Sequence, residues 1–217
     1  MSRGRKGGVP PEDREAAKQE RVAKQEGAAR KRKQAALRQR VIKYTVIALV
    51  VAGVIALLMP RKGSYSAGGS GESIDGVQLY RNPTGHTVSP VVYPQIPPAG
   101  GEHHPTWLNC GIYTESVPNV YAVHSLEHGA VWVTYDPGIS ADTLAALREY
   151  LPSSYVVLSP YVGLPSPIVV SAWNAQLRVE TPDDPRFAQF FEEYWRNQNV
   201  PEPGALCTGG IDGPGRS

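Results

Sequence analysis

Runs of apolar residues in the C-terminal half of the chain predict a small sheet. Residues 129–136 are almost entirely apolar, which is typical of a central strand buried on both faces. Apolar runs at 155–161 and 168–179 predict two more strands, the second long enough to contain a bend. Residues 77–120 contain seven prolines and several glycines, which predict ordered loops and short edge strands.

Two amphipathic segments alternate with these strands. Leucines three and four residues apart predict a helix over residues 140–151, with Ser140 as its N-cap. Clustered aromatic residues predict a second helix over residues 186–197. The order β-α-β-β-α predicts an α+β domain with a small, mostly antiparallel sheet and two helices.

A different pattern occupies residues 44–59, which carry no charge. Extended back to Val41, the segment has 19 residues with one lysine, long enough to cross a bilayer core. We therefore predict a transmembrane helix at residues 41–60. The alternatives are a buried core helix and a cleaved signal peptide, but signal peptides lack so long a basic region before the apolar run.

Charge orients this predicted span. Residues 1–43 contain 14 Lys or Arg against 5 Asp or Glu, whereas residues 59–217 contain 8 against 15. Because basic residues mark the cytoplasmic side, we expect a single-pass cell-membrane protein with its N-terminus in the cytoplasm. The expected partners are the bilayer and, for the basic arm, anionic lipid headgroups rather than nucleic acid. No protein partner is indicated.

These patterns divide the chain into five parts. They are a basic cytoplasmic arm (1–40), the span (41–60), a Gly/Ser linker (61–76), an extracytoplasmic α+β domain (77–210) and a flexible tail (211–217). Both cysteines, Cys110 and Cys207, fall in the outer domain, where oxidation is permitted. We expect a disulfide between them, with two free or metal-binding thiols as the alternative.

All five histidines lie within 43 residues, which favours a metal site. We expect copper or zinc to bind through His103, His104, His124 and His128. The alternatives are a loop fixed by hydrogen bonds without metal, and an interaction module. The surface of that module would be formed by aromatic residues around the histidines, namely Tyr93, Trp107, Tyr113 and Trp132.

Residues 124–128 also match H-x-x-E-H, the inverted zinc-peptidase motif. In that hypothesis Glu127 is the general base of a metal-dependent hydrolase, and Glu192 or Glu193 supplies a third ligand. The two histidines can share one ion on a helix, whereas on a strand they lie roughly 13 Å apart. Because the flanking residues allow only a turn or two of helix, enzymatic activity stays an open question.

Residues 97–104 (PPAGGEHH), Trp107, residues 110–113 (CGIY) and residues 123–137 (VHSLEHGAVWVTYDP) form a recognisable pattern. It closely resembles the bacterial family of domain of unknown function 3105, common in actinobacteria as membrane-anchored proteins. The resemblance covers residues 76–210 and implies an architecture and a location, but no activity. It also implies that His103, Glu127 and His128 belong to the family's own motif.

Overall fold

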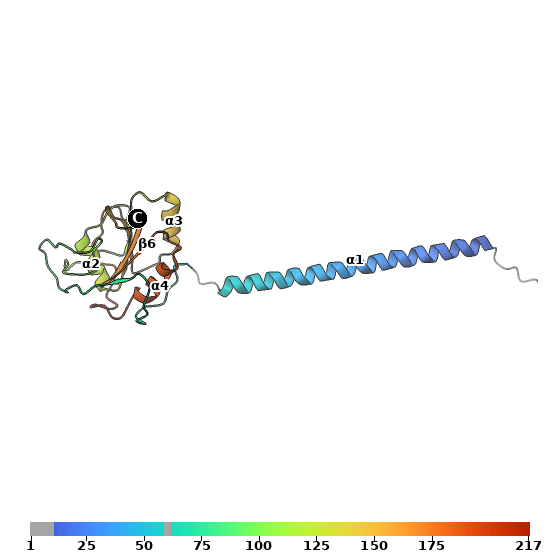
Figure 1. Cartoon of the computed structure of the whole chain (residues 1–217), viewed down its shortest axis with the longest axis horizontal. Coiled ribbons are helices and arrows are strands. Elements are labelled where there is room, and N and C mark those ends of the chain that lie inside the picture. Colours follow the sequence, from blue (N-terminus) through green and yellow to red (C-terminus); the bar gives the residue numbers. More distant parts are fainter. Residues whose placement is uncertain (1–10, 59–61) are drawn as a thin grey trace, which may run out of the picture. The chain divides into compact units, whose positions relative to one another are not determined.

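The computed structural model describes residues 11–58 and 62–217, which belong to two separate compact units. The first unit is one helix, α1 (Pro11–Leu58), of 48 residues, and the second is a mixed domain (Figure 1). Residues 1–10 of the predicted arm and 59–60 of the predicted span lie outside the described residues. Across the described ranges, no helix is long and apolar enough to cross a membrane. The span therefore stays a prediction.

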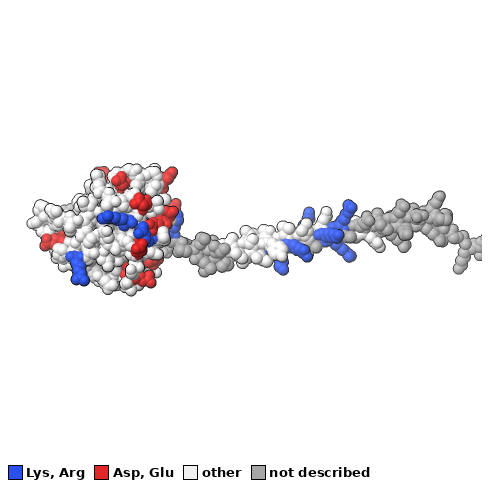
Figure 2. Space-filling model, in the orientation of Figure 1, with Lys and Arg blue, Asp and Glu red and all other residues white. Residues whose placement is uncertain are grey.

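Charged side chains differ between the two units (Figure 2). Lys and Arg gather on one portion of the described helix α1 and another portion is free of charge, whereas Asp and Glu are frequent on the visible face of the domain. Helix α1 passes from the predicted arm into the predicted span without a break. The apolar side chains on it include Ile42 and Leu49, which are 63% and 68% exposed.

Six strands form one sheet in the order β1-β6-β5-β3-β4-β2. Their bounds are Gln78–Leu79 for β1, Gly111–Ile112 for β2, Val131–Tyr135 for β3, Val156–Pro160 for β4, Ile168–Ala172 for β5 and Ala175–Val179 for β6. Strand β4 runs parallel to β3 and β2, and the other three pairs are antiparallel. The predicted α+β class is confirmed. The sheet is mixed and not purely antiparallel: three of its five strand pairs are antiparallel, and β3 and β4 are parallel because a helical crossover joins them.

Three helices belong to the domain, one more than the sequence predicts. They are α2 (Asn119–Glu127), α3 (Ala141–Glu149) and α4 (Pro185–Tyr194). Helix α3 begins at its predicted N-cap, where Ser140 Oγ accepts a hydrogen bond from Thr143 N at 3.0 Å. The long strand predicted over residues 168–179 is instead the hairpin β5–β6. Its turn includes Asn174 at φ +61°, a conformation that asparagine tolerates.

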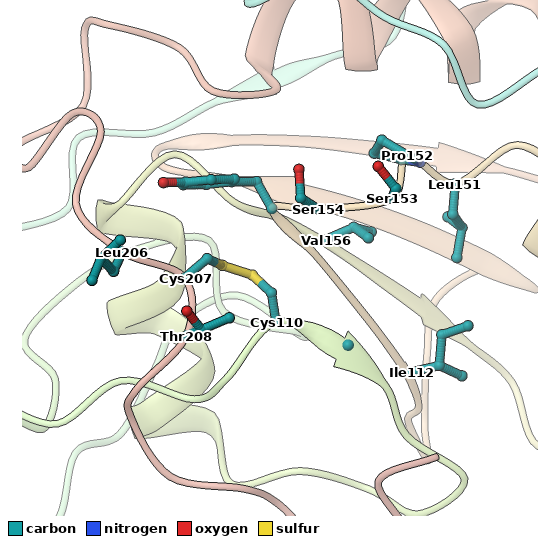
Figure 3. A pocket seen from close by; sticks show the side chains of 12 residues that line it. Cys110, Ile112, Leu151, Pro152, Ser153, Ser154, Val156, Leu206, Cys207 and Thr208 are labelled. Carbon is teal, nitrogen blue, oxygen red and sulfur yellow. A yellow bond between two sulfur atoms is a disulfide. The ribbon is translucent and has the colours of Figure 1, made fainter.

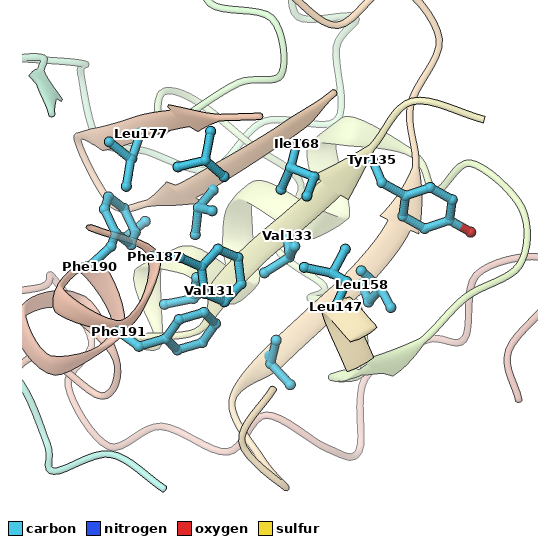
Figure 4. Close-up of a cluster of buried hydrophobic side chains, with 14 of the residues drawn as sticks. Val131, Val133, Tyr135, Leu147, Leu158, Ile168, Leu177, Phe187, Phe190 and Phe191 are labelled. Carbon is cyan, nitrogen blue, oxygen red and sulfur yellow. The ribbon is translucent and has the colours of Figure 1, made fainter. Parts of the chain in front are cut away.

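The sheet has two different faces because side chains alternate along each strand. Val131 and Val133 of β3 face a core closed by α3 and by aromatic residues of α4 (Figure 4). Trp132 belongs to a second cluster, which includes Ala122 and Leu126 of α2. Helix α2 therefore covers the face opposite α3 and α4.

Two segments that composition predicts to be flexible pack against this frame. In the predicted linker, Gly68 N donates to Trp195 O at 2.8 Å, and Tyr65 stacks on Phe191 with ring centroids 4.8 Å apart. In the predicted tail, Ser217 N donates to Ile112 O at 3.0 Å. The tail's isolated β-bridges join residues 211 and 216 to residues 108 and 113. Hydrogen bonding thus extends the domain to the last residue.

Candidate metal centre

Helix α2 carries the H-x-x-E-H segment. It begins at Asn119 and ends at Glu127, and His128 keeps helical backbone as its C-cap. Gly129 then takes φ +90°, which favours glycine and ends the helix before β3. Because His124 and His128 are four residues apart, they lie on one face of this turn, as the motif requires.

His103 enters the site from the Gly- and Pro-rich loop and is fully buried. The loop turns at Gly101, whose φ is +119°. The backbone of His103 then pairs with the segment around His86: His103 N donates to Gly85 O at 3.0 Å, and Thr87 N donates to His103 O at 2.7 Å. This short parallel bridge brings His86 beside His103, although the two residues are distant in sequence.

Four imidazole rings meet at this place, and we call His86, His103, His124 and His128 the histidine cluster. The ring centroid of His124 lies 4.9 Å from that of His86, 4.8 Å from that of His103 and 4.7 Å from that of His128. The rings of His86 and His103 are 4.9 Å apart. His124 therefore contacts each of the other three rings.

His104, which the sequence also suggests as a ligand, is not part of this cluster. Its ring lies 4.7 Å from that of Tyr121, and its Nδ1 accepts a hydrogen bond from Thr106 N at 3.0 Å. His104 contributes to the cluster through its backbone carbonyl oxygen, which accepts a hydrogen bond from His124 Nδ1 at 2.7 Å. The adjacent histidines 103 and 104 thus have different roles, as expected for neighbours in an extended chain.

Backbone carbonyls orient three of the four rings. Nδ1 of His103 donates to Gly101 O at 2.7 Å, and Nδ1 of His128 donates to Leu206 O at 2.8 Å. Nδ1 of His124 donates to His104 O, as described above. Because a carbonyl only accepts, each Nδ1 carries a proton. The lone pair of a neutral ring is then on Nε2, the arrangement found in metal-binding histidines.

Two carboxylates complete the site. Glu127 Oε2 lies 2.9 Å from Nε2 of His103 and 3.5 Å from Nε2 of His86. Glu202 Oε2 lies 3.2 Å from Nε2 of His128 and 3.9 Å from Nε2 of His124. Among the described residues, two groups have all their ligand atoms within 4.8 Å of one another, and these groups are His86–His103–His124–Glu127 and His124–His128–Glu202.

Burial and charge set the protonation of this site. Burial lowers the pKa of His124. The hydrogen bond to the His104 carbonyl raises it and the neighbouring histidines lower it, and the net pKa lies below its usual value. Burial by itself raises the pKa of Glu127, but the hydrogen bond to His103 and the nearby imidazoles outweigh it, so this pKa lies below its usual range. A neutral imidazole beside an ionised carboxylate is the state that binds metal.

The sequence did not identify two of the six groups. His86 is not among the predicted ligands although it belongs to the crowded set of five histidines, and Glu202 lies in a Pro/Gly-rich segment without any motif. The glutamates suggested as third ligands lie elsewhere: Glu193 accepts from Gly71 N at 2.9 Å, and Glu192 accepts from Ser66 N at 3.1 Å.

The predicted aromatic surface is also absent as a single patch among the described residues. Tyr113 and Trp132 are fully buried in the second cluster. Trp107 instead lies against the histidine cluster, with its ring centroid 5.2 Å from His128 and 5.8 Å from His124. Tyr93 donates from its hydroxyl to Glu102 O at 2.8 Å, next to His103.

A disulfide between Cys110 and Cys207 is present, with Cα atoms 5.4 Å apart. It borders a mostly apolar cavity of about 320 Å³, together with Leu151, Val156 and Leu206 (Figure 3). The same segment, residues 202–207, carries Glu202 at one end and the disulfide at the other. Between them lies the Leu206 carbonyl that orients His128. The disulfide therefore helps to hold the segment that orients His128 of the histidine cluster.

Comparison with known proteins places this domain in a family. The family model described as "Protein of unknown function (DUF3105)" matches residues 86–209, more than half of the chain. The chain belongs to this family. All four histidines of the cluster, both glutamates and both cysteines lie within the matched DUF3105 region, whereas α1 lies outside it. No curated protein and no solved structure matches the chain.

Proposed function

We propose that this domain binds a transition-metal ion through the histidine cluster, Glu127 and Glu202. The observation that carries the proposal is the orientation of His103, His124 and His128. Each donates its Nδ1 proton to a backbone carbonyl, which directs Nε2 toward a carboxylate. Such fixed tautomers support metal binding because ligand rings need no reorientation.

Zinc(II) or copper(II) suits these groups best. Imidazole and carboxylate are the available donors, and both cysteines are used in the disulfide. Thiolate ligands, which select copper(I), are therefore missing from the described part of the site. A proton or a metal ion must lie between His103 Nε2 and Glu127 Oε2 at 2.9 Å because two lone pairs repel at that distance. We expect metal to replace that proton, so that binding releases protons.

Metal titration of the full chain tests this proposal. The protein is purified without a polyhistidine tag, stripped with a chelator and titrated with zinc or copper(II) in a calorimeter. The adjacent pair His103 and His104 supplies a matched control, since one faces Glu127 and the other Tyr121. We expect His103→Ala to lower the affinity at least about 100-fold, more than the loss of an outer-shell partner, and His104→Ala to change it little. The proposal would be overturned if both variants lost the same metal affinity, or if the unaltered chain bound neither metal.

A second candidate function is metal-dependent hydrolysis with Glu127 as general base. It is supported by the helical geometry of residues 124–128 and by Glu202, which completes a His₂Glu set of the kind used by zinc peptidases. Glu127→Gln separates the roles. If Glu127 is a base, the variant retains zinc but loses hydrolysis of an activated ester such as p-nitrophenyl acetate. If it is a ligand, zinc affinity falls as well.

We also propose that residues 41–60 anchor the domain on the outer side of the cell membrane, with the basic arm facing anionic headgroups inside. The charge asymmetry, the exposed apolar side chains of α1 and the disulfide support this location. A membrane-impermeant maleimide applied to intact cells should label Glu115→Cys but not Ser2→Cys. The reverse pattern would contradict the location.

A further inference from the structure

The metal centre has more ligands than one ion uses. Six side chains offer donor atoms, whereas zinc sites in proteins are almost always four-coordinate. These donors form two overlapping groups, and the groups share His124. How His124 is used therefore decides how many ions the site holds.

His124 can serve only one ion. Its Nδ1 donates to His104 O at 2.7 Å, so a single lone pair, that of Nε2, is left for a metal. A bridging imidazolate would need both ring nitrogens, and that hydrogen bond occupies one of them. Assigned to the group of His128 and Glu202, His124 still leaves three donors in the other group, namely His86, His103 and Glu127.

We infer that the centre holds two metal ions side by side, a conclusion that rests on the proposed metal-binding function. The inner triad, His86, His103 and Glu127, binds one ion. The outer triad, His124, His128 and Glu202, binds the other. The ring contacts of His124 with both His86 and His103 make the two triads immediate neighbours.

The two triads match in composition and in burial. Each consists of two imidazoles and one carboxylate. In each, two donors are buried and one is half-exposed: His86 is 41% exposed in the inner triad, and Glu202 is 44% exposed in the outer triad. The exposed member gives each ion a route from solvent, while the buried pair fixes the geometry.

The charge of the centre indicates what else binds there. Two divalent ions bring four positive charges, and the two carboxylates neutralise only half of them. Each triad also leaves one position of a four-coordinate ion open. A shared anion that bridges the ions fills both positions and offsets at least half of the remaining charge. We expect hydroxide or an oxyanion such as phosphate in this role, as in two-metal hydrolytic sites.

Stoichiometry tests the two-ion centre on the full chain. After chelator treatment, saturation with zinc and gel filtration, elemental analysis should give two zinc ions per chain. With copper(II), ions about 3.5–4 Å apart couple magnetically, so the paramagnetic resonance signal per copper should fall well below that of isolated copper(II). One zinc per chain would overturn the two-ion centre and leave the proposed function standing. If the chain bound neither zinc nor copper(II), both would be overturned.

Paired variants assign each ion to its triad. His128→Ala with Glu202→Gln should leave one ion per chain, and so should His86→Ala with His103→Ala. His104→Ala, the control, should keep two. If one ion were bound by His86, His103, His124 and Glu127 together, the first pair of substitutions would leave the wild-type stoichiometry unchanged. That result would also overturn the assignment.

Discussion

The two faces of the sheet are built by different means. The face covered by α3 and α4 is an apolar core made by regular elements, with Phe187, Phe190 and Phe191 packed on β3, β5 and β6. The face covered by α2 supports the histidine cluster and is completed by loops. These loops come from distant parts of the chain and are joined by isolated β-bridges and the disulfide.

This difference leads us to expect that stability and the proposed metal binding are separable. Burial of apolar area is non-directional and supplies most of the free energy of folding. A metal centre needs donor atoms at fixed positions, which here depend on hydrogen bonds to carbonyls such as Gly101 O and Leu206 O. Changes on the first face should therefore lower the free energy of unfolding, and changes on the second should first alter the site.

The largest effect is expected from the apolar face. Phe190→Ala should lower the free energy of unfolding by about 3–5 kcal/mol, because it leaves a cavity in a fully buried core. Gln189→Ala, on the exposed side of the same helix, should change it by less than about 0.5 kcal/mol. Denaturant unfolding measures both. Zinc affinity of the folded Phe190 variant should stay close to that of the wild type. A matching loss of affinity would show that the faces are coupled.

The disulfide is the corresponding element of the loop face. Replacing both cysteines, Cys110→Ser with Cys207→Ser, should lower the free energy of unfolding by about 2–5 kcal/mol. It should also weaken the outer ion about 10–100-fold, because the segment that carries Glu202 and the Leu206 carbonyl loses its anchor. The inner ion should be retained. Calorimetric zinc titration checks this, and equal weakening of both ions would contradict the separate triads.

A smaller loss of stability is expected when the C-terminal tail is released from the domain. The buried side chain of Asn109 bonds to Asp212 at 2.7 Å and to the backbone of Gly210. Asn109→Ala should therefore lower the free energy of unfolding by about 1–3 kcal/mol. Hydrogen exchange should quicken at residues 211–217 but not in β3. Asn119→Ala, which removes one bond to Tyr161, is the control and should leave the tail unchanged.

The contrast between the faces also explains what the sequence predicts well. Apolar periodicity identifies β3, α3 and α4, because each element carries its own local pattern of buried positions. Ser140 is found as an N-cap for the same reason. The hairpin turn at Asn174 was missed because residues 168–179 remain apolar on both sides of it.

The site depends on contacts that no local pattern encodes. The H-x-x-E-H segment is visible in sequence, yet its helix is short and its flanks resemble strands. His86 reaches the cluster through a bridge to His103, and Glu202 reaches it because its backbone N–H donates to Glu127 O at 3.1 Å. Both contacts join loop segments that carry no regular apolar pattern. Predicting them requires the fold, whereas proposing a metal site among the five histidines requires only their crowding.

The smallest expected effect on stability comes from two buried tyrosines, one on each face, which ionise at high pH. Tyr65 packs on the α4 side, where its hydroxyl donates to Tyr150 O, and Tyr93 lies in the loop beside His103. Burial raises the pKa of each to about 12. An unfolded tyrosine ionises near pH 10. Each tyrosine therefore contributes its full share to the free energy of unfolding below pH 10, and this share is lost as the pH rises toward 12.

Substitution by phenylalanine measures the two contributions. Tyr65→Phe and Tyr93→Phe should each lower the free energy of unfolding by about 0.5–1.5 kcal/mol at pH 8, since one hydrogen bond is lost. Above pH 10, both variants should lose stability less steeply than the wild type, because the ionising group is gone. Since both pKa values are about 12, equal flattening is expected from urea unfolding. If Tyr93→Phe has no effect on that slope, the loop face admits solvent before the core unfolds.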